Sequence, residues 1–183
     1  MSRLNYGQLF PALDFPAVGG GTISLPGDLA GSYGVILIYR GSWCPYCNAQ
    51  LAAFSRALDS LSELNVKVVA LSVDDEDTSA ALVAKRKLRF PVGHNADADK
   101  VAIATGAYVN DDPHYLQSTG FILAPDGTVC LAVYSSGAIG RLVPDDVVGF
   151  IRYLTDASGD AISNTEQPHV TRPDGRGTAE QPR

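Results

Sequence analysis

The sequence GVILIYRGSWCPYCNAQL, residues 34–51, joins a continuous apolar run to two cysteines that stand three positions apart. The apolar run is typical of a strand that is buried on both faces of a mostly parallel sheet. Beyond it, Cys47, Leu51 and Phe54 recur at steps of four and three, which predicts a helix with one apolar face. The cysteine pair is therefore predicted to lie where a buried strand leads into a helix.

This position predicts thiol–disulfide chemistry. Proline is favoured at the first position of a helix, so Pro45 makes Cys44 the predicted N-cap residue. A sulfur at the N-cap faces unpaired backbone N–H groups and the positive end of the helix dipole, and both favour the nucleophilic thiolate. We therefore expect Cys44 to be the exposed, attacking sulfur, and Cys47, which begins the apolar face, to be the resolving sulfur.

Other uses of a Cys-X-X-Cys pair fit this sequence less well. A structural zinc site needs a closed set of ligands, and besides this pair the chain offers Cys130 and three histidines. Covalent haem attachment requires a histidine directly after the second cysteine, where the chain has Asn48. A purely structural disulfide is rare in a reducing cytosol. The interpretation that remains is a redox pair without metal or cofactor, and Cys130, in an apolar run, is predicted to be an inert core residue.

Length and composition predict one cytoplasmic domain followed by a tail. The chain has 183 residues and a net charge of −6, with an acidic run at 74–77 that argues against nucleic-acid binding. No apolar run approaches the roughly 20 residues of a membrane span, and the first residues lack the pattern of a signal peptide. Residues 1–155 are therefore assigned to one domain, and the polar residues 156–183 to a flexible tail.

Turn signals and hydrophobic patterns predict the order β-hairpin, βαβα, short helix, ββα. Strands that alternate with helices in this way indicate an α/β fold. The expected elements are an N-terminal hairpin that includes 22–25, strands at 33–39 and 66–73, helices at 44–65 and 75–88, a short strand or loop at 90–92, a helix at 98–105, strands at 117–124 and 128–135, and a helix from Pro144.

A family resemblance rests on four stretches of the chain. They are GQLFPAL at 7–13, YRGSWCPYC at 39–47, VALSVD at 69–74 and TGFILAPDG at 119–127. In this order they resemble the AhpC/TSA redoxins (alkyl hydroperoxide reductase C and thiol-specific antioxidant), a peroxiredoxin-like branch of the thioredoxin superfamily. The resemblance spans about residues 6–155. It implies an α/β thioredoxin-like fold, with a central mixed β-sheet flanked by helices and an N-terminal β-hairpin.

The chain departs from the family around the reactive cysteine. Peroxiredoxins carry a Pro-X-X-X-Thr/Ser-X-X-Cys block, but counted back from Cys44 the proline and hydroxyl positions hold Leu37 and Gly41. Counting from Cys47 fits no better. The arginine that the family places three residues before a phenylalanine of a later strand is replaced by Ser118. The dithiol of an oxidoreductase is therefore present, while the family's peroxide-activating set is not recognisable in the sequence.

The resemblance also implies which residues surround the pair. The loop before the later strand should face the Cys-X-X-Cys turn, and either His114 or Tyr115 is expected there, His114 as a candidate for proton transfer. An arginine beside a thiol lowers the pKa of the thiol or binds a peroxide oxygen. Arg40 and Arg141 are the candidates for this role. If Arg40 does not have it, its side chain is expected to face solvent. Trp43 is expected to cover one side of the thiol. The supporting residues are thus Arg40, Ser42, Trp43, His114, Ser118, Thr119 and Arg141.

The predicted function is that of a thiol-dependent antioxidant oxidoreductase that reduces peroxides. The Cys44 thiolate attacks the peroxide, Cys47 then attacks Cys44, and an external reductant, either a thioredoxin-like protein or a small thiol, reduces the disulfide. Two alternatives stay open: a thioredoxin-like protein disulfide reductase, and a non-enzymatic redox sensor or binding module. The resemblance also suggests a homodimer.

Overall fold

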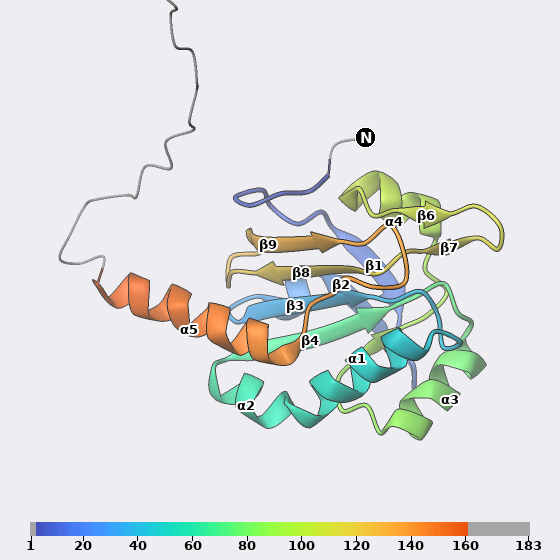
Figure 1. The fold of residues 1–183 in the computed structure, drawn as a ribbon, viewed down its shortest axis with the longest axis horizontal. Helices are drawn as coiled ribbons and strands as arrows, with labels where there is room; N and C mark the ends of the chain where they lie inside the picture. The colour runs from blue at the N-terminus through green and yellow to red at the C-terminus, as the bar shows by residue number, and fades with distance from the viewer. Residues whose placement is uncertain (1–2, 161–183) are drawn as a thin grey trace, which may run out of the picture.

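The computed structural model describes residues 3–160. At its centre is a five-stranded mixed sheet in the order β5-β4-β3-β8-β9 (Figure 1). The central strand β3 (Tyr33–Ile38) runs parallel to β4 (Val66–Leu71) and antiparallel to β8 (Thr119–Leu123). The outer strands are β5 (Val92–Gly93), beside β4, and β9 (Val129–Tyr134), beside β8.

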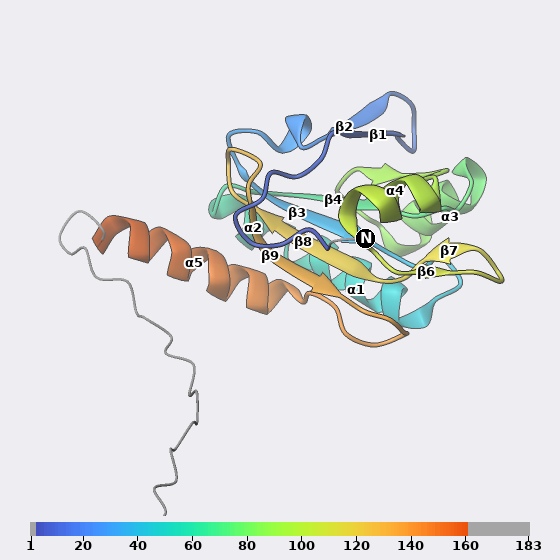
Figure 2. The same ribbon diagram turned by 90° about the horizontal axis from the view of Figure 1, so that it is seen from above.

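Helices and a hairpin cover the two faces of this sheet. One face packs against α1 (Pro45–Arg56), α2 (Leu58–Glu63), α3 (Glu76–Arg86) and α5 (Pro144–Asp160). The other face packs against α4 (Ala98–Thr105) and the hairpin of β1 (Leu13–Pro16) and β2 (Thr22–Leu25). Figure 2 shows the hairpin and α4 on one side of the sheet and α1 and α5 on the other. The predicted thioredoxin-like α/β fold, with its N-terminal hairpin, is confirmed.

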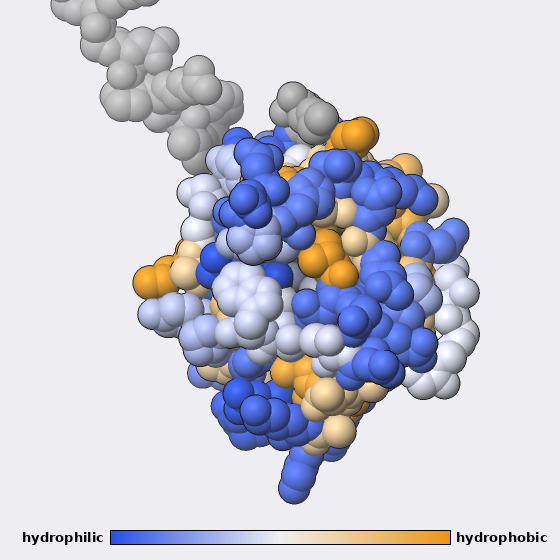
Figure 3. Space-filling view, turned by 90° about the vertical axis from the view of Figure 1, so that its right-hand side faces the viewer, coloured by the Kyte–Doolittle hydropathy of each residue, from blue (hydrophilic) through white to orange (hydrophobic). Residues whose placement is uncertain are grey.

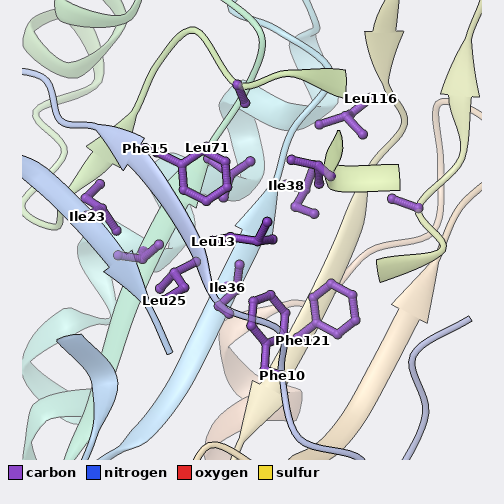
Figure 4. Close-up of a cluster of buried hydrophobic side chains, with 14 of the residues drawn as sticks. Phe10, Leu13, Phe15, Ile23, Leu25, Ile36, Ile38, Leu71, Leu116 and Phe121 are labelled. Carbon is purple, nitrogen blue, oxygen red and sulfur yellow. The ribbon is translucent and has the colours of Figure 1, made fainter. Parts of the chain in front are cut away.

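The central strand β3 is buried on both faces, as its apolar run predicts. Ile36 and Ile38 point into the cluster beneath the hairpin (Figure 4). Val35 and Leu37 belong to the second cluster, beneath α1. Because neighbouring residues of a strand point to opposite faces, a continuous apolar run fills both clusters at once. Packing on both faces therefore holds β3 in place, and with it the start of the loop at residue 39.

Three parts of the fold differ from the predicted elements or extend them. The helix predicted at 44–65 is two helices, α1 and α2, which meet at Ala57 (φ −83°, ψ 0°), the residue that caps the end of the first and the start of the second. Two short elements were not predicted, the 3₁₀ turn η1 (Gly27–Leu29) and the hairpin of β6 (Val109–Asn110) and β7 (Tyr115–Leu116). Helix α5 continues past residue 155 to Asp160, and the rest of the predicted tail, 161–183, lies outside the described residues.

Within residues 3–160 no helix combines the length and apolar character needed to cross a membrane.

Candidate active site

The two cysteines lie at the N-terminus of α1, at the edge of the sheet where the parallel strands β3 and β4 end. Figure 3 looks onto this side of the molecule, where hydrophobic side chains form separate patches between hydrophilic ones. Cys44 is the N-cap residue, as predicted: its backbone is extended, and its Sγ accepts a hydrogen bond from the N–H of Cys47 at 3.4 Å. Both thiols are free, so the pair is in its reduced form.

The prediction that Cys44 is the exposed sulfur is wrong. Cys44 and Cys47 are both fully buried, whereas their neighbours Trp43 and Tyr46 are 54% and 51% exposed. The cause is the N-cap geometry, because the Cys44 side chain turns back toward the N–H of Cys47 and joins the hydrophobic cluster that contains Leu51. Neither sulfur is therefore open to solvent in this structure.

Two hydrogen bonds reach the sulfur of Cys47 from outside α1. The backbone N–H of Arg40 donates to Cys47 Sγ at 3.4 Å, and Nη1 of Arg141 donates to the same sulfur at 3.3 Å. The guanidinium of Arg141 also donates to the carbonyl oxygen of Ala138 and lies 6.0 Å from the ring centre of Tyr46. Arg141, from the loop before α5, is thus held over the pair by three contacts.

Arg40 is the second arginine near the pair, and two aromatic rings hold its side chain. Its Nη2 donates to the hydroxyl oxygen of Tyr115 at 2.7 Å. Its Cζ lies 4.8 Å from the ring centre of Trp43 and 5.2 Å from that of Tyr115, and these two rings meet edge to face. The Nε of Arg40 is buried without a hydrogen-bond partner, and the Arg40 side chain interacts with the thiol of Cys44. The structure thus brings both arginines to the pair.

These surroundings separate the two thiols electrostatically. Burial alone would raise the pKa of Cys44, but the hydrogen bonds from the Cys47 thiol and backbone N–H, and the charges of Arg141 and Arg40, lower that pKa overall. For Cys47, burial and the hydrogen bond with Cys44 raise the pKa and outweigh the donors Arg141 and Arg40. Cys44 is therefore the thiol that ionises first, and Cys47 keeps its proton.

A half-buried carboxylate fixes the loop between β3 and α1. Asp74, just after β4, accepts a hydrogen bond from the backbone N–H of Ser42 at 2.7 Å, and Asn48 donates to the Ser42 carbonyl oxygen at 2.8 Å. Burial raises the pKa of Asp74. Gly41 has φ +147°, and a Cβ there would lie 2.4 Å from Nε1 of Trp43. Glycine therefore stands at the family's hydroxyl position because this backbone and its close neighbours exclude a side chain.

Other predicted site residues are not joined to the thiols. Ser118 and Thr119 are buried, but Thr119 Oγ1 donates to the Gln117 carbonyl oxygen, and within residues 3–160 no hydrogen bond links either residue to a cysteine. His114 is half-exposed and faces the carboxylate of Asp99 at 3.5 Å. Its proposed part in proton transfer therefore has no support from its contacts.

Cys130 lies on β9, at the margin of the cluster beneath α1, and is half-buried rather than enclosed in the core. Burial raises its pKa, so it is mostly a neutral thiol near pH 7. No group of three or more potential metal ligands gathers anywhere among the described residues.

Asp74 was not predicted as a site residue, because in the sequence it stands at the end of the VALSVD stretch and in an acidic run, and neither pattern indicates a contact with the loop before α1. A signal was present: the parallel pairing places Ile38 opposite Leu71, so the residues that follow the two strands meet at one edge. The carboxyl ends of neighbouring parallel strands are where such loops bring their side chains together. Tyr115 was expected near the pair only as an alternative to His114, because its contact depends on the unpredicted β6–β7 hairpin.

Comparison with known proteins identifies the family of this chain. The profile of the AhpC/TSA family matches residues 6–132. The peroxiredoxin of Methanothermobacter thermautotrophicus (strain Delta H) is 26% identical over 161 residues, which cover 84% of this chain and 75% of that protein. The peroxiredoxin of Treponema denticola is 27% identical over 149 residues, or 78% of this chain and 70% of its own.

Solved structures show the same fold. AhpC of Mycobacterium tuberculosis superposes with a TM-score of 0.73 at 20% identity, over 85% of this chain and 96% of that chain. Peroxiredoxin 6 of Arenicola marina gives a TM-score of 0.75 at 18% identity, over 85% and 75% of the two chains. With the family profile covering most of the described fold, the chain belongs to the AhpC/TSA family of peroxiredoxins, thiol peroxidases of the thioredoxin superfamily.

Proposed function

We propose that this protein reduces peroxides with Cys44 as the attacking thiolate and Cys47 as the resolving thiol. The observation that carries the proposal is the separation of the two thiols by their surroundings. Cys44 caps α1 and interacts with the charges of two guanidinium groups, which lower its pKa, while burial raises the pKa of Cys47. A dithiol peroxidase needs this difference in pKa, because one sulfur attacks the peroxide as a thiolate and the other reacts only after the sulfenic acid has formed.

The chemistry balances with one peroxide and one external dithiol. The Cys44 thiolate attacks one peroxide oxygen, the O–O bond breaks, and the leaving oxygen departs as an alcohol or water after taking a proton. Cys44 is thereby oxidised to a sulfenic acid. The Cys47 sulfur then attacks Cys44, the S–O bond breaks, and water leaves as the disulfide forms. An external dithiol returns two electrons and two protons to the pair.

Arg40 and Arg141 together take the role of the single arginine that the family carries at the position of Ser118. Arg40 interacts with Cys44 and has a buried Nε–H without a partner, which is a donor available to the oxygen that leaves. Arg141 donates to Cys47 and stabilises the thiolate that this second sulfur forms before it attacks. In this proposal Arg40 serves the peroxide step and Arg141 the resolving step.

An apolar groove beside the pair favours organic hydroperoxides over hydrogen peroxide. The groove has a volume of about 500 Å³, and Arg141 forms the part of its wall that touches Cys47. Ile139, 73% exposed, and Val143 stand at its rim. The remaining lining residues are Tyr46, Ala49, Gln50, Ala53, Gly140, Leu142 and Pro144. A hydroperoxide with an apolar chain removes this surface from water while its O–O bond lies near the sulfurs.

Exchanging both rim residues for serine should slow the reaction with cumene hydroperoxide by about tenfold and leave the reaction with hydrogen peroxide unchanged, because only the larger substrate uses the apolar surface. The measurement is the rate constant for oxidation of the Ile139→Ser, Val143→Ser protein by each peroxide. Ile103→Ser on α4, an isoleucine of similar exposure, is the matched control. Equal slowing with both peroxides would mean that the groove does not select the substrate.

The proposed function itself is tested by stopped-flow oxidation of the reduced protein. The single tryptophan, Trp43, lies next to Cys44 and reports the change by its fluorescence. Oxidation by a peroxide should be roughly 10³-fold faster than that of free cysteine at the same pH, because the thiolate and its donors are preorganised. A rate no faster than that of a free thiol, together with rapid reduction of insulin disulfides, would instead favour a disulfide reductase.

A further inference from the structure

The unpredicted β6–β7 hairpin places a buried tyrosine beside the redox pair. Tyr115, on β7, is 7% exposed, and its hydroxyl oxygen accepts a hydrogen bond from Nη2 of Arg40 at 2.7 Å. The edge-to-face contact of its ring with Trp43 spans 5.1 Å between centroids. One side chain from a distant hairpin thus contacts two residues of the loop that leads to Cys44.

We propose that Tyr115 is a positioning residue for the peroxidase reaction, because its hydroxyl and ring hold the guanidinium of Arg40 against Cys44. The inference rests on the proposed function only for the identity of the attacking sulfur. The contacts of Tyr115 with Arg40 and Trp43 do not depend on it.

The contacts of Arg40 leave its Nε–H free to donate. Its Nη2 donates to the hydroxyl of Tyr115, and its Cζ lies 4.8 Å from the ring centre of Trp43 and 5.2 Å from that of Tyr115. These three contacts restrict a side chain that otherwise has several freely rotating bonds. The buried Nε–H, which has no partner, is therefore held in one orientation before the peroxide arrives, and it needs no reorganisation during the reaction.

A phenol is suited to this task because it is uncharged. Neither of the ion pairs among the described residues involves Arg40, so no carboxylate neutralises its positive charge. An aspartate or glutamate in the place of Tyr115 would hold the guanidinium but would also cancel part of the field at the thiol. A neutral anchor leaves the full charge of Arg40 acting on Cys44.

The ionisation of Cys44 reports this arrangement. The titratable or charged groups around Cys44 are Cys47 on α1, Arg40 after β3, Arg141 before α5, Tyr115 on β7, Tyr46 beside Arg141, and Asp74 after β4. A cation close to a thiol lowers its pKa, so a guanidinium that drifts away from Cys44 raises it. The pH at which Cys44 forms its thiolate therefore responds to the position of Arg40 when the other groups are unchanged.

The experiment compares Tyr115→Phe with Tyr134→Phe, both in the full chain. Each exchange removes one hydrogen-bonded hydroxyl and keeps the ring, but the hydroxyl of Tyr134 donates to the carbonyl oxygens of Leu4 and Thr105 instead. Tyr115→Phe should move the thiolate absorbance of Cys44 to higher pH and slow peroxide oxidation at pH 7 by about three- to tenfold. Tyr134→Phe should titrate as the wild type does. An unchanged titration in Tyr115→Phe would overturn the proposal.

A double-mutant cycle separates positioning from a general structural effect. In an Arg40→Gln background, Tyr115→Phe should cause no further slowing, because the residue that it positions is gone. The same slowing in both backgrounds would show that Tyr115 acts independently of Arg40 and would contradict the proposal. The thiolate titration needs no peroxide, so a protein that failed as a peroxidase would still reveal whether Tyr115 sets the pKa of Cys44.

Discussion

Replacing Cys44 with serine should abolish the fast reaction with peroxide, whereas replacing Cys47 with serine should leave one rapid turnover. A serine hydroxyl stays protonated near pH 7 and is a poor nucleophile, so Cys44→Ser should slow oxidation by about 10³-fold or more. Cys47→Ser keeps the sulfur at the N-cap of α1 and both arginines. Stopped-flow fluorescence of Trp43 measures the first oxidation in each variant.

The two variants also differ in their products. In Cys47→Ser no thiol is available to resolve the sulfenic acid of Cys44, so this species should accumulate, react with dimedone, and proceed to sulfinic acid in excess peroxide. In the wild type the Cys44–Cys47 disulfide should form instead. Mass spectrometry of the peptide that contains both residues distinguishes these products. Cys130→Ser, which removes a half-buried thiol on β9, should behave as the wild type does.

The reverse result has a specific structural meaning. Two donors from outside the helix reach Cys47, the backbone N–H of Arg40 and the guanidinium of Arg141. If Cys47→Ser lost the fast phase and Cys44→Ser kept it, these donors would outweigh the N-cap position and the assignment of the two sulfurs would be reversed. The experiment therefore decides whether the N-cap position or the donors from outside the helix are the main activator.

The parts of the fold that the sequence predicts are those in which local pattern and burial agree. β3 is a continuous apolar run because it is buried on both faces, and α1 begins at a proline directly after its capping cysteine. The break between α1 and α2 at Ala57 could not be predicted, because no proline or glycine marks it in the sequence. The β6–β7 hairpin is only two residues long on each side, too short for alternation to be visible.

The site was predictable to the extent that its residues are close in sequence. Arg40, Trp43 and the two cysteines lie within one loop and one helical turn, so a family motif reveals them. Arg141, in the loop before α5, contacts Cys47 across 94 positions, and Tyr115, on β7, contacts Arg40 across 75 positions, so only the folded chain brings them there. The predicted exposure of Cys44 failed because a capping side chain can turn inward as well as outward, and sequence does not record which.

Replacing Arg40 with glutamine should slow the reaction with peroxide by about 100-fold at pH 7, the size expected when a preorganised donor and its charge are both lost. Glutamine keeps the backbone N–H that donates to Cys47, so the loop and the resolving sulfur retain that contact. The pKa of Cys44 should rise, because the nearby positive charge favours its thiolate. Part of the loss should therefore be recovered at higher pH, and the remainder reflects the missing donor to the leaving oxygen.

Two further arginine exchanges complete this argument. Arg141→Gln should slow disulfide formation more than the initial oxidation, because Arg141 donates to Cys47. Arg89→Gln, whose guanidinium pairs with the exposed Asp59 on the outer surface, should change neither step. Rapid mixing followed by acid quench and mass analysis separates sulfenic acid from disulfide. If Arg141→Gln slowed the initial oxidation and Arg40→Gln did not, Arg141 would be the arginine that activates the peroxide, and the buried Nε–H of Arg40 would have no catalytic part.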